Sequence, residues 1–206
     1  MKPVAVVRCD LLFVATLGML LGFTAPATGA EGEHPGRAVF VSKGCATCHE
    51  ERAVLQAPHL SVLRKDRSLV QLTAAMWNQA PIMWANLQDP GLRWPRLTAR
   101  EMAALAQYLN GAAPEDPSPD LGRGQVVLVE KGCARCHSPG GEGGNAAKDL
   151  LRRVRFDSKA AWAAALWNHA PTMLALAAER GAEYPLMQPG ELADLIGFLR
   201  EMARPR

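Results

Sequence analysis

The sequence lacks the features that several common protein classes require. Its formal net charge is only +3. A nucleic-acid-binding protein would show clustered Lys and Arg on a strongly basic domain, so we expect no nucleic-acid partner. Val, Ile, Thr and Tyr are too sparse and scattered for a β-sandwich, whereas Ala is abundant. The composition therefore predicts an all-α protein.

The sequence also lacks an apolar run of the length that a membrane-spanning helix needs, which is about 20 residues. The apolar run Leu11–Phe23 covers only 13 residues. It follows the positive residues Lys2 and Arg8 and precedes small residues at 28–30, an order typical of a secretory signal peptide over residues 1–30. We therefore expect an exported, periplasmic protein. The alternative is an uncleaved segment that anchors the chain to the inner membrane.

Cysteine is scarce, and four of the five cysteines lie in two CxxCH motifs. An exported protein would normally oxidise such pairs to disulfides, so another reaction must consume these thiols. CxxCH is the signature of covalent haem attachment: two thiols add to the vinyl groups of haem and the histidine binds its iron. We predict two covalently attached haem c groups. The attachment residues are Cys45, Cys48, His49, Cys133, Cys136 and His137.

Two other uses of paired cysteines have to be weighed against haem. A zinc site usually places its cysteine pairs about 15–20 residues apart, whereas 84 residues separate Cys48 from Cys133. A thioredoxin-like redox pair would lie near a βαβ pattern. It would not explain the histidine that follows both pairs. The motifs therefore favour haem.

The two motifs belong to a sequence repeat. Residues 36–49 match residues 124–137 at an offset of 88, and residues 77–83 match residues 167–173 at an offset of 90. Prolines and acidic residues between the two halves are typical of a semi-extended linker. We predict a first domain at 31–112, a linker at 113–123 and a second domain at 124–206.

The repeat predicts matching helices in both halves. Residues 37–48 and 125–136 are expected to form helices that run into the CxxCH motifs. Apolar residues recur at helical spacing in segments 98–109 and 189–199, which predicts a closing helix in each half.

A middle helix is also predicted in each half. Ser68 and Ser158 are placed to cap the starts of these helices. We expect the helices to end near residues 80 and 170, because a proline follows each position and would stop or kink the helix.

The repeat also predicts the second axial ligands of the two irons. Met83 and Met173 occupy equivalent positions in a Trp-Asn-x-Ala-Pro-x-Met segment, 34 and 36 residues after the CxxCH histidines. A thioether sulfur favours ferrous iron and raises the reduction potential. One alternative is that both methionines fill the core. Another is that His169 binds the second iron, although its counterpart in the first half is Gln79.

Other repeated side chains are candidates for roles near the haems. The Trp-Asn pairs at 77–78 and 167–168 are interpreted as packing on haem, bonding a propionate or orienting the methionine sulfur, with helix packing and capping as the alternative. Lys43 and Lys131 are interpreted as part of a solvated face, with attraction of a redox partner as the alternative.

The combined pattern resembles tandem class I cytochrome c domains. The matching features are a Gly-x-x-x-Phe segment before the first motif, the CxxCH itself, a later methionine and a final helix that carries an aromatic residue. The resemblance implies that the first and last helices of each half cross. Gly36 would then meet Tyr108, and Gly124 would meet Phe198.

The resemblance has two further implications for the haem ligands. It implies that the carbonyl of Pro58 accepts a hydrogen bond from the imidazole of His49. The family often places its distal methionine just before a proline that leads the last helix, but here Trp94 and Tyr184 stand at those positions. The distal methionine would therefore come from earlier in each half.

The resemblance implies a di-haem c-type cytochrome but says little about its physiological role; the leading hypothesis is that it carries electrons between redox protein partners. With both axial positions of each iron filled by the protein, we expect a carrier rather than an enzyme. The alternatives are an electron-transfer subunit of a periplasmic dehydrogenase or oxidase complex, and a small di-haem redox enzyme.

Overall fold

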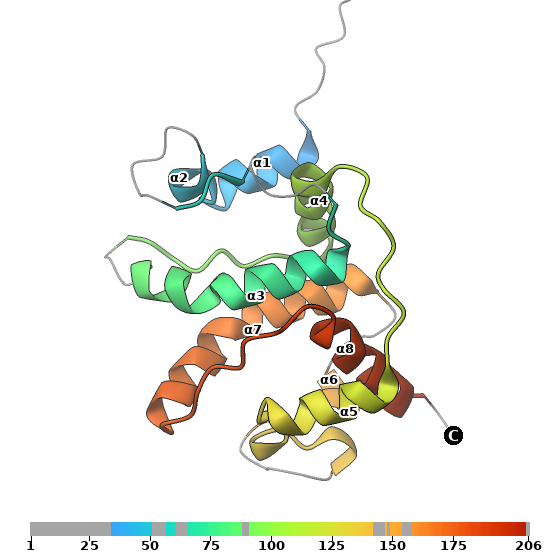
Figure 1. Cartoon of the computed structure of the whole chain (residues 1–206). Helices are drawn as coiled ribbons and strands as arrows, with labels where there is room; N and C mark the ends of the chain where they lie inside the picture. The colour runs from blue at the N-terminus through green and yellow to red at the C-terminus, as the bar shows by residue number, and fades with distance from the viewer. Residues whose placement is uncertain are drawn as a thin grey trace, which may run out of the picture. The chain divides into compact units, whose positions relative to one another are not determined.

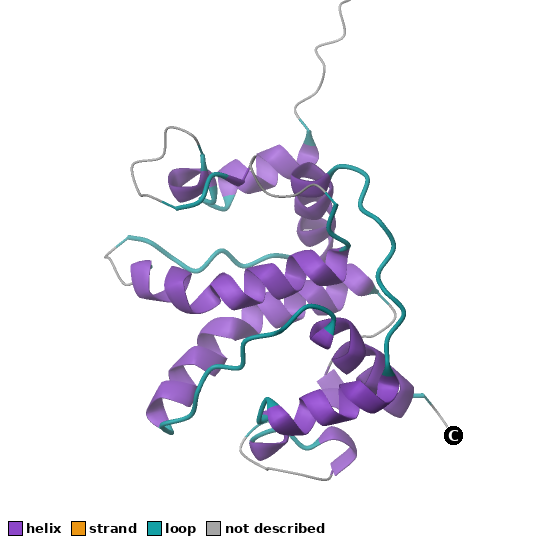
Figure 2. Cartoon of the chain, viewed as in Figure 1, coloured by secondary structure: helices purple, strands orange, loops and turns teal. Residues whose placement is uncertain are grey.

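The computed structural model describes residues 34–50, 57–60, 66–87, 91–141, 147, 149–153 and 158–204. In these ranges all regular structure is helical and no strand is present, which confirms the predicted all-α class (Figure 1, Figure 2). Residues 33–206 form one compact unit. No helix in the described ranges is both long enough and apolar enough to span a bilayer. The signal-peptide prediction for residues 1–30 lies outside the described residues.

Helices α1, α2, α3 and α4 of the first half correspond in order to α5, η2, α7 and α8 of the second half. The first half contains α1 (Pro35–Ser42), α2 (Ala46–His49), α3 (Leu69–Asn86) and α4 (Ala99–Asn110). The second half contains α5 (Leu121–Glu130), η2 (Cys133–Arg135), η3 (Pro139–Gly141), α6 (Leu150–Arg153), α7 (Lys159–Glu179) and α8 (Glu191–Met202). Helix α1 packs against α4, α5 packs against α8, and α3 and α7 lie side by side where the halves meet (Figure 1).

Glycine allows the first and last helices of each half to cross closely. An ideal Cβ atom on Gly36 would lie 2.5 Å from the Cβ of Tyr108, and one on Gly124 would lie 2.7 Å from the Cβ of Phe198. Both would also collide with a backbone carbonyl of the last helix. Only glycine fits such an approach. The contacts implied by the cytochrome c resemblance are confirmed.

The helices before the two motifs end earlier than predicted. The expected continuous helices at 37–48 and 125–136 are each interrupted, because Gly44 has φ +77° and Gly132 has φ +72°. This left-handed conformation ends a helix and costs glycine little. Each CxxCH motif therefore begins its own short turn, α2 or η2, and the prediction of continuous helices was wrong.

The starts of the middle helices are capped as predicted. The Oγ of Ser68 accepts a hydrogen bond from the N–H of Gln71 at 3.3 Å. The Oγ of Ser158 accepts one from the N–H of Ala161 at 3.2 Å. Each bond satisfies a backbone donor that has no partner within the first turn of its helix.

The predicted ends of the middle helices were wrong. Helix α3 continues through Pro81 to Asn86, and α7 continues through Pro171 to Glu179. A proline inside a helix removes the hydrogen bond to the carbonyl four residues earlier. For Pro171 that carbonyl belongs to Trp167. It accepts a hydrogen bond from the Trp94 indole of the other half instead, at 3.2 Å.

Candidate haem-binding sites

The predicted haem ligands of the second half border a single cavity. Cys133, Cys136 and His137 border this cavity of about 550 Å³ together with Met173 and His169. Its other walls come from the later part of α7 and from the segment that leads into α8. The volume lies in the range of small-molecule sites, roughly 300–1,000 Å³. Attachment residues and candidate axial ligands therefore meet in one space.

The first cysteine of each CxxCH motif carries a neutral thiol. Burial raises the pKa of the Cys45 and Cys133 thiols to about 11, so both thiols are neutral at neutral pH. A neutral thiol is a poor nucleophile and a poor metal ligand. A thioether to haem is also uncharged, so it suits the same buried positions. The four motif cysteines form no disulfide.

The imidazole of His49 is held in one tautomer. Its Nδ1 lies 2.9 Å from the carbonyl oxygen of Pro58. Because a carbonyl only accepts, Nδ1 carries the proton and donates. The lone pair of Nε2 then stays available for a metal, and the hydrogen bond fixes the orientation of the ring. This contact confirms what the resemblance to cytochrome c implied.

The two candidate methionine ligands occupy equivalent positions. Met83 in α3 and Met173 in α7 each lie two residues after the proline that their helix passes through. Both side chains are partly buried against the core. They lie inside helices, not beyond helix ends as the sequence suggested. That Met83 faces His49 across a haem remains a prediction.

His169 borders the same cavity as Met173. Its ring centroid lies 6.0 Å from that of His137. Burial lowers the pKa of His169, and the nearby His137 lowers it further. His169 lies one helical turn before Met173, so both side chains project from the same face of α7. The counterpart in the first half, Gln79, is exposed.

The Trp-Asn pair of α3 contacts the second half of the chain. The Asn78 amide donates to the carbonyl of Met187 and accepts from the N–H of Met187, both at 2.8 Å. The Trp77 indole N–H donates to the carbonyl of Pro185 at 2.6 Å. The Trp77 ring stacks on Tyr184 with centroids 4.6 Å apart. All three bonds reach the segment between α7 and α8.

The Trp-Asn pair of α7 makes the reciprocal contacts with the first half. The Asn168 amide donates to the carbonyl of Leu97 at 2.7 Å and accepts from the N–H of Leu97 at 2.9 Å. The Trp167 indole donates to the carbonyl of Pro95 at 2.6 Å, and its ring centroid lies 4.3 Å from that of Trp94. Both pairs therefore bond to the backbone of the opposite half. Sequence reasoning missed this crossing.

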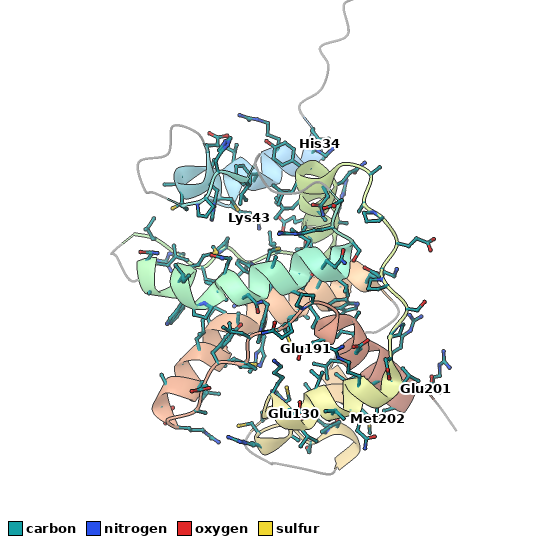
Figure 3. All side chains as sticks on the ribbon, in the orientation of Figure 1. His34, Lys43, Glu130, Glu191, Glu201 and Met202 are labelled. Carbon is teal, nitrogen blue, oxygen red and sulfur yellow. The ribbon has the colours of Figure 1, made fainter. Side chains whose placement is uncertain are left out.

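The two repeated lysines before the motifs form ion pairs. Lys43 lies 2.9 Å from Glu101, and Lys131 lies 2.8 Å from Glu191. One member of each pair, Lys43 and Glu191, is labelled in Figure 3. A backbone hydrogen bond and then the Lys43 bond lower the pKa of Glu101. Burial alone would raise the pKa of Glu191, but the bond from Lys131 and a backbone N–H lower it. Both lysines tie the segment before a motif to the last helix of its half, a role that the sequence analysis did not assign to them.

The comparison with protein families agrees with the first of these sites. The family model described as cytochrome c matches residues 34–113, a range that holds α1 to α4 and the first CxxCH motif. The match supports a c-type cytochrome and haem-based electron transfer. No curated protein and no solved structure matches the chain. The second CxxCH motif lies outside the matched range.

Proposed function

We propose that this protein is a periplasmic electron carrier in which each half holds one covalently bound haem c with His/Met axial ligation. The cavity of the second half carries the proposal, because Cys133, Cys136, His137 and Met173 all border it. The match of residues 34–113 to cytochrome c gives independent support for the first half.

Each group of residues has a defined task in this proposal. The cysteines of each CxxCH hold the haem covalently, and the bound haem supplies one-electron chemistry at iron. The Pro58 carbonyl keeps His49 in the tautomer whose Nε2 can bind iron. Met83 and Met173 would each supply a second protein ligand to the iron of their half, which would suit electron transfer without bond-making.

We assign the distal position to Met173 in the second half and to Met83 in the first. The methionine is present at the same place in both helices, whereas His169 is replaced by Gln79 in the first half. His169 remains the rival ligand of the second iron, because it borders the same cavity.

The proposal extends to organisation and location. The matching order of helices in the two halves supports two domains, proposed at 31–112 and 124–206 with a linker at 113–123, although α5 already begins at Leu121. The positive, apolar and small residues of segment 1–30 support export with removal of the signal. The electron donor and acceptor are then other redox proteins.

Optical spectroscopy of the purified holoprotein tests the proposal. We expect reversible reduction of two haems, and a weak ferric band at the red end of the spectrum with the strength of two Met-ligated haems. Met83→Ala and Met173→Ala should each remove about half of that band. His169→Ala is the matched control and should leave the band intact. High-spin ferric features or rapid carbon monoxide binding in the wild type would contradict a carrier with filled axial positions.

A further inference from the structure

We propose that each half of the chain positions the wall of the other half's haem site. Trp77 and Asn78 are positioning residues for the second site, and Trp167 and Asn168 are positioning residues for the first. This inference rests on the proposed function, because it concerns the surroundings of the proposed haems.

The wall of the second site is the segment 181–188, nearly all of which borders the cavity. Residues 182–188 form no helix or strand, so their backbone groups must find partners elsewhere. Three of these groups bond to side chains of α3: the carbonyl of Pro185 and both the N–H and the carbonyl of Met187. Helix α3 thus holds the wall from the side opposite the cavity.

Met187 shows how the wall is oriented. The other residues of segment 181–188 border the cavity, but Met187 does not, and it is only 6% exposed. Its backbone bonds to Asn78 while its neighbours Leu186 and Gln188 border the cavity. Releasing Met187 would therefore free the residues on both sides of it to move relative to the haem.

The repeat assigns the same arrangement to the first half. Segment 92–98 is the counterpart of 182–188 and also forms no helix or strand. The carbonyl of Pro95 and both backbone groups of Leu97 bond to Trp167 and Asn168 of α7. The two walls are thus held by reciprocal, crossed contacts.

The crossed contacts have a consequence for reduction potential. The potential of a haem depends on its burial and on the polarity around it. Ferric haem carries one more positive charge than ferrous haem, so water that enters a loosened wall stabilises the ferric state and lowers the potential. A change at Asn78 should therefore lower the potential of the second haem, and a change at Asn168 should lower that of the first.

The test compares the full-length holoprotein variants Asn78→Ala and Asn168→Ala, each the matched control of the other. In the ferrous state, the haem ring current moves the proton resonances of a coordinated methionine far from their usual position. Met83→His and Met173→His should each remove one such set, which assigns the two sets. Asn78→Ala is expected to shift the Met173 set, leave the Met83 set in place and lower one of the two potentials. Asn168→Ala is expected to do the converse.

Hydrogen exchange provides a second readout. Loss of the bond to Asn78 should speed exchange at the amide of Met187 by about ten- to a hundredfold, with no change at Leu97. Asn168→Ala should speed exchange at Leu97 and not at Met187. If Asn78→Ala fails to fold, Trp77→Phe removes the bond to the Pro185 carbonyl and keeps a ring to stack on Tyr184. It should shift the Met173 set and leave the Met83 set in place, with a smaller effect.

The outcomes separate this inference from the proposed function. Suppose that wild-type protein shows both sets of haem-shifted methionine resonances. If each asparagine variant then alters the set of its own half, or alters neither set, the inference is overturned and the proposed function stands. If wild-type protein shows no haem-shifted methionine, His/Met ligation fails and the inference falls with it.

Discussion

The indole N–H of Trp94 donates a hydrogen bond to the backbone carbonyl of Trp167 at 3.2 Å. This carbonyl lies four residues before Pro171, so its own helix supplies no donor for it. The donor comes instead from the segment that precedes α4 in the other half. The bond gives this carbonyl a partner at the point where α7 continues through Pro171 toward Met173 and the cavity.

Replacing Trp94 with Phe should reveal the dependence of α7 on this bond. The variant removes the indole donor and leaves the buried carbonyl of Trp167 without a hydrogen-bond donor. This loss should lower the free energy of unfolding by about 1–3 kcal/mol. Pro171→Ala supplies a backbone N–H to the same carbonyl, so Trp94→Phe should cost less in that background. Denaturant unfolding of the four holoproteins measures the coupling. Equal cost in both backgrounds would contradict this account of the helix.

Two glycines of α5 should differ sharply in their tolerance of Ala. A Cβ on Gly124 would collide with the backbone of Asp194 and with Phe198, so Gly124→Ala should destabilise the protein by about 1–3 kcal/mol or more. Gly122 is the matched control, because its Cβ would lie 3.4 Å from the nearest atom, Oδ1 of Asp120. Gly122→Ala should be neutral or stabilising by up to about 1 kcal/mol. Similar unfolding midpoints for the two variants would argue against the close helix crossing.

The two lysine–glutamate pairs predict a loss of stability in acid. Glu101 and Glu191 have pKa values below their ordinary value of 4.5 in the folded protein. A carboxyl whose pKa is lowered by folding stabilises the protein above its unfolded pKa, and this contribution is lost as pH falls through its folded pKa. Stability should therefore decline below about pH 4.5. Unfolding measured from about pH 6 to pH 3 should show a shallower decline for Glu101→Gln/Glu191→Gln, and an unchanged slope would refute the role of these pairs.

Several features were predictable because local chemistry or the family pattern determines them. Ser68 and Ser158 cap helices through bonds to residues three positions away. Gly36 and Gly124 occupy helix crossings whose spacing the cytochrome c resemblance supplied, and the same resemblance supplied the partner of His49. None of these predictions required knowledge of how the two halves meet.

The missed features depend on partners far away in the chain. Pro171 should have ended α7 by local rules, but the helix continues and Trp94 of the other half replaces the lost bond. Asn78 and Asn168 were interpreted within their own halves, yet their partners lie in the opposite ones. A signal was present, because the same Asn recurs in both halves within apolar helices. Such repetition indicates a shared polar partner without identifying it.

The intact mass of purified protein, produced in a host that attaches haem c, tests the central claim most directly. The account predicts a chain that begins after residue 30 and carries two added haem groups, one on the peptide with Cys45 and Cys48 and one on the peptide with Cys133 and Cys136. A chain with a single haem, or with free thiols at either motif, would contradict it.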